Sequence, residues 1–217
     1  LPVATAAKIA NRMLTVIVTT GDGDCYGEGG NHFIHAIRRN IDITVIVHNN
    51  QIYGLTKGQA SPTTDPGFVT GVQTRGVILE PFHPLSCAIS LGAGFVARGF
   101  VKDAEHLTWL IAEGVKHRGF SLIDVLQPCV SFNKKNTYQW YSDRLYRLNE
   151  EGAFHNPHDK GAAYERAAEW GERIPIGIIY RHEGETYEEK SGINKRAPLG
   201  EQSIEQRDMS AFIEAYT

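Results

Sequence analysis

The chain has 217 residues, of which 41% are hydrophobic and 22% charged, which is enough for one sizeable core and an appended lobe. A formal net charge of −3 carries no signal of nucleic-acid binding, and three scattered cysteines exclude a disulfide framework. No apolar stretch reaches the roughly 18 to 20 residues that span a bilayer, so we expect a cytoplasmic protein without membrane contact.

Two apolar, β-branched runs, residues 14–20 and 43–47, are typical of strands buried on both faces. The segment between them, Gly29 to Arg39, can form a helix. A strand, a helix and a strand in this order form a parallel, right-handed unit. The residues that follow the two runs should therefore meet at the carboxyl edge of one sheet, where open α/β sheets bind ligands.

Gly21-Asp22-Gly23 follows the first run and Asn49-Asn50 follows the second. Flanking glycines let the backbone approach a diphosphate, and the next helix supplies N–H groups at its start. A carboxylate set directly against phosphate would repel it, so Asp22 indicates an intervening divalent cation. Oxygen donors from Asp22 and Asn50 favour Mg²⁺. Together the two motifs predict a site for a magnesium-bound diphosphate.

Other phosphate-binding motifs fit less well. Tyr26 stands where a dinucleotide fingerprint needs its third glycine, and there is no P-loop Gly-Lys-Ser/Thr sequence. The remaining alternative is a glycine-rich turn that only reverses the chain, with Asn49-Asn50 as an ordinary start of a loop.

Helices and strands alternate further along the chain. We expect a helix at Leu85–Leu91, a strand at Phe95–Ala97, a helix at Ala104–Val115 and a strand at Leu122–Leu126. This order predicts an α/β fold with a doubly wound parallel sheet that ends near Gln127. Cys129 would then lie at the carboxyl edge, on the side of the proposed site.

Further motifs accompany these two: Gly21-Asp22-Gly23-Asp24, Gly29-Gly30-Asn31-His32, His35-Ala36, Arg38-Arg39-Asn40, Asn49-Asn50-Gln51-Ile52-Tyr53-Gly54-Leu55-Thr56, Gly58-Gln59 and Ser61-Pro62-Thr63-Thr64. With them the chain resembles the thiamine diphosphate-binding β subunit of two-subunit 2-oxoacid:ferredoxin oxidoreductases. The resemblance is dense from Leu1 to about Phe132 and looser as far as Glu188.

The resemblance implies a thiamine diphosphate-binding fold in which Asp22, Asn50 and the backbone carbonyl of Ile52 bind Mg²⁺. The implied cofactor-binding set is Gly21, Asp22, Gly23, Asp24, His32, Asn50, Ile52 and Thr56. Such enzymes oxidatively decarboxylate a 2-oxo acid to an acyl-coenzyme A and pass electrons through a [4Fe–4S] cluster to ferredoxin. They work with an α subunit, which supplies the acid that activates the thiamine.

Lys57 lies in the Tyr53–Thr64 loop, which leaves the same sheet edge and would cover the cofactor. Its ammonium could neutralise a substrate carboxylate, so we take it as the candidate catalytic residue, a solvated loop lysine being the alternative. Thr56, Gln59 and Thr63 are weaker candidates for hydrogen bonds to the diphosphate or substrate.

Cys129 taken alone would be a small buried hydrophobe. The resemblance implies instead that it is one of four thiolates around a [4Fe–4S] cluster, the other three preceding the thiamine motif. We therefore expect that an N-terminal portion is absent and that this chain alone does not hold a cluster and is inactive.

Three polar residues surround the predicted phosphate turn. His32 and His35 share a helix face without a third zinc-type ligand, so we expect His35 to pack and His32 to form at most a polar wall of the cofactor site. Glu28 stands where the family has an apolar residue. It either faces the site or turns outward and complements the helix dipole.

We divide the chain into a cofactor-binding domain, residues 1–130, and a C-terminal extension or arm, residues 131–217. The extension is expected to pack on the domain or on a partner subunit through its large apolar side chains: Trp140, Tyr141, Leu145, Tyr146 and Leu148. Arg173–Tyr180 is expected to form a strand, and the tail from Glu183 is polar enough to be mobile.

Two other functions remain open. A non-oxidative thiamine-dependent decarboxylase or lyase subunit would share the cofactor site and would need no cluster thiolates. A non-catalytic scaffold subunit would keep the fold, and its complex would stay active after Asp22→Ala.

Overall fold

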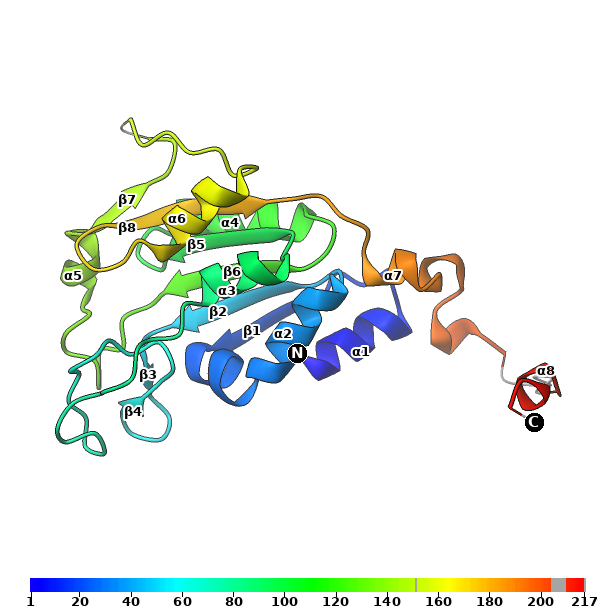
Figure 1. Ribbon diagram of the computed structural model, residues 1–217, viewed down its shortest axis with the longest axis horizontal. Coiled ribbons are helices and arrows are strands. Elements are labelled where there is room, and N and C mark those ends of the chain that lie inside the picture. The colour runs from blue at the N-terminus through cyan, green and yellow to red at the C-terminus, as the bar shows by residue number, and fades with distance from the viewer. Residues whose placement is uncertain (151, 204–209, 217) are drawn as a thin grey trace.

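The computed structural model describes residues 1–150, 152–203 and 210–216. A six-stranded sheet with the strand order β1-β2-β6-β5-β8-β7 runs through it, and helices cover both faces (Figure 1). The elements are α1 Pro2–Ala10, β1 Ile17–Gly21, the π-helical segment η1 Gly23–Glu28, α2 Gly30–Arg39, β2 Thr44–Asn49, β3 Ile52–Tyr53, β4 Gln59–Ala60, α3 Pro84–Leu91, β5 Phe95–Phe100, α4 Ala104–Lys116, β6 Ser121–Leu126, α5 Tyr138–Ser142, β7 Leu145–Arg147, α6 Lys160–Ala168, β8 Ile174–Arg181, α7 Tyr187–Lys190, η2 Ile193–Lys195, η3 Leu199–Glu201 and α8 Ser210–Glu214.

The sheet is mostly parallel, as predicted. Strands β1, β2, β6 and β5 run parallel, β8 is antiparallel to β5, and β7 is parallel to β8. Strand β2 is buried nearly throughout. The prediction that the first run is buried on both faces was wrong, because β1 is an edge strand and leaves 47% of Ile17 exposed.

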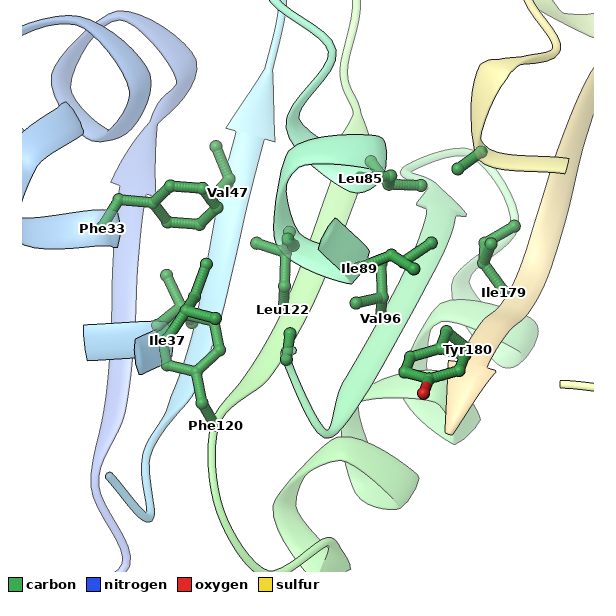
Figure 2. Close-up of a cluster of buried hydrophobic side chains, with 14 of the residues drawn as sticks. Phe33, Ile37, Val47, Leu85, Ile89, Val96, Phe120, Leu122, Ile179 and Tyr180 are labelled. Carbon is green, nitrogen blue, oxygen red and sulfur yellow. The ribbon is translucent and has the colours of Figure 1, made fainter. Parts of the chain in front are cut away.

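The main core lies on the face that α2, α3 and α6 cover. Apolar residues of α2 recur at the spacing of one helix face, and Phe33 and Ile37 project onto the sheet beside Val47 (Figure 2). Helix α3 adds Leu85 and Ile89 in the same cluster. These contacts pack α2 and α3 against the strands.

Helix α4 covers the opposite face of the sheet. Leu110 packs there with Phe95 and Ile123, and a Cβ at Gly114 would come within 2.9 Å of the end of the Ile123 side chain, which would have to shift. None of the described helices is long and apolar enough to cross a membrane.

The C-terminal region shares the sheet and the core. Strands β7 and β8 extend the sheet, while Tyr141 and Leu148 are buried within this chain. Tyr141 packs with Phe100 and Leu126, and Leu148 lies in the main core; packing on a partner subunit stays open. The division at residue 130 stays a prediction.

The prediction of a mobile tail from Glu183 was wrong for α7. Thr186 forms a capping box with Glu189 at the start of this helix. Glu188 is buried, and its carboxylate accepts a hydrogen bond from the Asp42 N–H at 3.2 Å. The polar composition of this segment suggested mobility, but Glu188 has a specific hydrogen-bond partner, Asp42, in the loop after α2.

Phe33→Ala should lower the free energy of unfolding by about 3–5 kcal/mol, because it removes a fully buried ring between α2 and the sheet. Chemical denaturation measures the change. Ile34→Ala, on the exposed side of the same helix, is the matched control. Equal losses in the two variants would contradict this account of the core.

Candidate functional site

The structure brings the two predicted motifs together at the carboxyl edge of the sheet. Strand β1 ends at Gly21, paired with His48 near the end of β2, so Asp22 and Asn50 follow neighbouring strand ends. The Asn50 N–H lies 3.5 Å from Oδ1 of Asp22. This is the juxtaposition that the βαβ argument predicted.

Asp22 is only 2% exposed. Its Oδ2 accepts hydrogen bonds from the hydroxyls of Ser61 at 2.5 Å and Thr63 at 2.8 Å. Burial raises the pKa of this carboxyl, while the two hydroxyls act in the opposite direction. Oδ1 faces the Asn50 N–H at a long distance, and a buried carboxylate oxygen of this kind is a donor that suits Mg²⁺.

The turn after β2 presents the other two predicted magnesium ligands. Oδ1 of Asn50 accepts a hydrogen bond from the Ile52 N–H at 3.1 Å, and Gln51 between them has a left-handed φ of 58°. Asn133, only 2% exposed, donates from Nδ2 to the Asn50 carbonyl at 3.1 Å. Ser61 and Asn133 support the site although the sequence gave no individual reason to select them.

Gly23 owes its identity to a neighbouring ring. A Cβ there would lie 2.2 Å from the ring of Tyr53. The Tyr53 hydroxyl donates to the Gly23 carbonyl at 3.3 Å and to Glu28 at 3.2 Å. Glu28 therefore turns toward Tyr53, and whether this exposed carboxylate faces the cofactor stays open. Burial and the Glu28 carboxylate raise the pKa of Tyr53 to about 12.

The remaining predicted residues surround this edge at its surface. His32 is exposed and lines a hollow with Asp24 and Glu28, and His35 is half-buried, with Nδ1 3.0 Å from an Arg38 nitrogen. Thr56 donates to Gln59 at 2.5 Å rather than pointing to Asp22.

Lys57 lies in the turn between β3 and β4 with a left-handed φ of 79°. It is exposed, and the structure does not bring it against Asp22 through any hydrogen bond or ion pair among the described residues.

Cys129 lies beside the turn between β3 and β4. Its Sγ is 4.0 Å from the position that a Cβ would take on Gly54. Cys25 is buried in η1, and Cys87 is on α3. The described part of the chain contains no group of three His, Cys, Asp or Glu residues suited to a metal. One thiol does not fit the four-thiolate requirement of a [4Fe–4S] cluster, so the residues present do not hold such a cluster by themselves.

A second buried carboxylate lies below the first. Oδ1 of Asp124 accepts from the Tyr26 hydroxyl at 3.0 Å and from Nδ2 of Asn49 at 3.1 Å. Oδ1 of Asn49 in turn lies 3.0 Å from the Thr63 hydroxyl. Burial raises the pKa of Asp124. Asn49 and Thr63 therefore connect Asp124 to Asp22.

Two family matches divide the chain. Residues 1–125 match the family described as thiamine pyrophosphate enzyme, C-terminal TPP binding domain. Residues 129–195 match the C-terminal family of the pyruvate ferredoxin oxidoreductase β subunit. The chain belongs to the β subunits of the 2-oxoacid:ferredoxin oxidoreductases. The resemblance found in the sequence is thereby confirmed, and the family is one of oxidoreductases.

Individual relatives agree with this family. The chain is 45% identical over 205 residues to a 2-oxoacid:ferredoxin oxidoreductase subunit β of Sulfolobus sp, covering 90% of this chain and 67% of the relative. It is 47% identical over 131 residues to the 2-oxoglutarate oxidoreductase subunit KorB of Mycobacterium tuberculosis, covering 60% of this chain and 35% of that one. The chain thus spans about two thirds of the first relative.

A solved structure shares the fold. The 2-oxoglutarate:ferredoxin oxidoreductase from Magnetococcus marinus, with 2-oxoglutarate, coenzyme A and succinyl-CoA bound, superimposes with a TM-score of 0.87 at 33% sequence identity. The match covers 100% of this chain and 72% of the other.

Thr63→Val should lower the free energy of unfolding by about 1–3 kcal/mol, because it takes a hydroxyl donor from the buried Asp22 carboxylate while keeping the side-chain shape. Denaturant titration of the cofactor-free protein measures the loss. Thr74→Val, on the exposed loop before α3, should stay within about 0.5 kcal/mol of the parent protein. An unchanged stability for Thr63→Val would mean that the hydroxyl does not support Asp22.

Proposed function

We propose that this chain is the thiamine diphosphate- and Mg²⁺-binding subunit of an enzyme that converts a 2-oxo acid and coenzyme A to an acyl-CoA and CO₂. The observation that carries the proposal is the buried Asp22 carboxylate facing the Asn50 turn, in a chain of this family. The reaction releases two electrons and a proton, and we propose that an iron–sulfur cluster passes the electrons singly to ferredoxin.

Different residues at the carboxyl edge of the sheet would bind the metal ion and the diphosphate. Asp22, Asn50 and the Ile52 carbonyl would hold Mg²⁺, and the backbone N–H groups of Gly23 and Asp24 would hold the diphosphate. The bound thiamine supplies the nucleophilic carbon and the electron sink for decarboxylation, while the protein supplies orientation and electrostatics.

Ser61 and Thr63 orient Asp22, and their hydroxyls oppose the rise in its pKa that burial causes. Both hydroxyls donate to the same oxygen, Oδ2, which leaves Oδ1 directed at the Asn50 turn. Because the hydroxyls are fixed before any ligand arrives, little reorganisation is needed when a cation binds.

Lys57 is proposed to contact the substrate carboxylate. It is exposed on the β3–β4 turn, at the edge where the cofactor is expected, and its charge has the sign needed. His32 and Thr56 are assigned to the rim of the cofactor site.

Cys129 is proposed as one thiolate of the cluster. Its position beside Gly54, on the loop that would cover the cofactor, supports this proposal, because electron transfer from the cofactor requires a nearby cluster. The other thiolates would come from residues outside this sequence. An α subunit would complete the active site in the cytoplasm, with the acid that activates the thiamine.

The full-length protein, assembled with its partner subunit, should reduce a viologen dye anaerobically with at least one of a panel of 2-oxo acids. The reduction should require both coenzyme A and thiamine diphosphate. Dye-independent release of CO₂ would favour the non-oxidative decarboxylase instead.

Asp22→Asn in the same assay separates catalysis from a scaffold role. We expect activity and Mg²⁺-dependent cofactor affinity to fall at least about 100-fold, because a buried charged ligand is lost. Asp143→Asn, at the exposed end of α5, is the control and should match the parent protein. Full activity of the Asp22 variant would leave only the scaffold function.

Lys57→Met should raise the KM for the 2-oxo acid about tenfold and leave the affinity for thiamine diphosphate unchanged, because it removes one exposed charge from the substrate side. Steady-state kinetics and cofactor titration measure the two quantities. Lys160→Met, at the start of α6, is the charge-matched control. An unchanged KM would mean that Lys57 is a solvated loop lysine that does not contact the substrate.

A further inference from the structure

A small pocket of about 30 Å³ lies beneath the start of α3, beside the end of α6. Its walls include Arg98, Asp124, His83 and Trp170. The exposed His83 lies at its rim, and the other three residues come from β5, β6 and the segment after α6. Neither Asp22 nor Asn50 lines it. This pocket is too small for a nucleotide or a phosphate ester.

Arg98 is the unexplained group in this pocket. Its side chain is 4% exposed, and its Nε and Nη1 have no hydrogen-bond acceptor within the described part of the chain. The guanidinium carbon lies 5.5 Å from the centre of the Trp170 ring, which provides a flat wall. Buried donors without acceptors destabilise a protein, so a guanidinium in this position calls for a partner.

Asp124 is not a sufficient partner. Its Oδ2 lies 3.8 Å from Nε of Arg98, beyond hydrogen-bond distance. The carboxylate is already engaged, since Tyr26 donates to Oδ1 and Nδ2 of Asn49 lies within 3.3 Å of both oxygens. The charges of Asp124 and Arg98 therefore offset each other across the strands, while the donors of Arg98 remain unused.

The start of α3 supplies the second observation. This helix begins with Pro84, and no side chain caps it. Its first backbone bond runs from the Cys87 N–H to the His83 carbonyl, so the N–H groups of Leu85 and Ser86 have no partner inside the helix. Both residues are buried. Uncapped N–H groups and the positive end of the helix dipole favour a negative charge.

We propose that this pocket binds one small planar oxyanion, a short carboxylate or bicarbonate. The Arg98 guanidinium would engage it through the parallel N–H groups of Nη1 and Nη2 at its end, which match the two oxygens of such an ion. The free N–H groups and the positive dipole end at the start of α3 would stabilise the negative charge of the ion. Asn49, Gln51 and Thr63 also line the pocket, next to the proposed magnesium ligands, but the binding of the anion to Arg98 does not depend on the proposed function.

Calorimetry of the assembled protein, loaded with thiamine diphosphate and Mg²⁺, tests the site. Formate, nitrate and bicarbonate are titrated in turn, with a bulky organic sulfonate holding the ionic strength constant. We expect saturable binding of one ion per chain with a Kd on the order of 1 mM, the range open to a ligand of three or four heavy atoms. Comparing formate with bicarbonate identifies which source of the planar anion is preferred.

Arg98→Met should weaken the binding at least tenfold and Arg98→Lys by a smaller factor, since an ammonium lacks the paired donors. Arg118→Met removes an exposed arginine that pairs with Glu189 and should bind like the parent protein. Circular dichroism checks the fold of each variant. Equal binding by the parent protein and a folded Arg98 variant would overturn the proposal, as would the absence of saturable binding.

A crystal structure of the parent protein grown in nitrate gives a reading that needs no variant. A planar anion on Nη1 of Arg98 supports the site. Ordered water alone in the pocket, bridging Arg98 to Asp124, would show that solvent satisfies the guanidinium and would overturn it.

Discussion

The burial of the Asp22 carboxylate is the constraint on which the carboxyl edge depends. A buried charge is costly unless donors or a cation offset it. The donors here, Ser61 and Thr63, come from the long connection between β2 and α3, which must fold back over the strand ends to deliver them. The path of that connection, and with it the start of α3, follows from the need to satisfy one carboxylate.

Residues of the C-terminal region also form hydrogen bonds to the connection between β2 and α3. Asp65 accepts hydrogen bonds from Nε1 of Trp170 at 2.9 Å and from Nε2 of Gln51 at 3.2 Å. Asn133 holds the Asn50 carbonyl. Residues after 130 thus fix the turn that carries the proposed magnesium ligands. A cofactor-binding domain that lacked them would keep the motif and lose its support.

Local patterns predicted α2, α3, α4 and β6 because each has an apolar period of its own. They misjudged β1, because whether an apolar strand has a neighbour on both sides depends on strand order. Arg98 and Asp124 stayed hidden for a related reason. Each is a single charge inside an apolar strand, and only the β5–β6 register sets them side by side. Glu28 likewise needed the position of Tyr53 before its hydrogen-bond partner could be named.

The hydroxyl of Thr63 couples the two buried carboxylates. It lies 2.8 Å from Oδ2 of Asp22 and 3.0 Å from Oδ1 of Asn49, but it has one proton to donate. Nδ2 of Asn49 lies 3.1 Å from Oδ1 of Asp124, and Oδ1 of the same amide lies 3.0 Å from the Thr63 hydroxyl, so the amide bridges the two groups. Thr63 and Asn49 thus connect the two buried carboxylates through side chains alone, and replacing either side chain would break that connection.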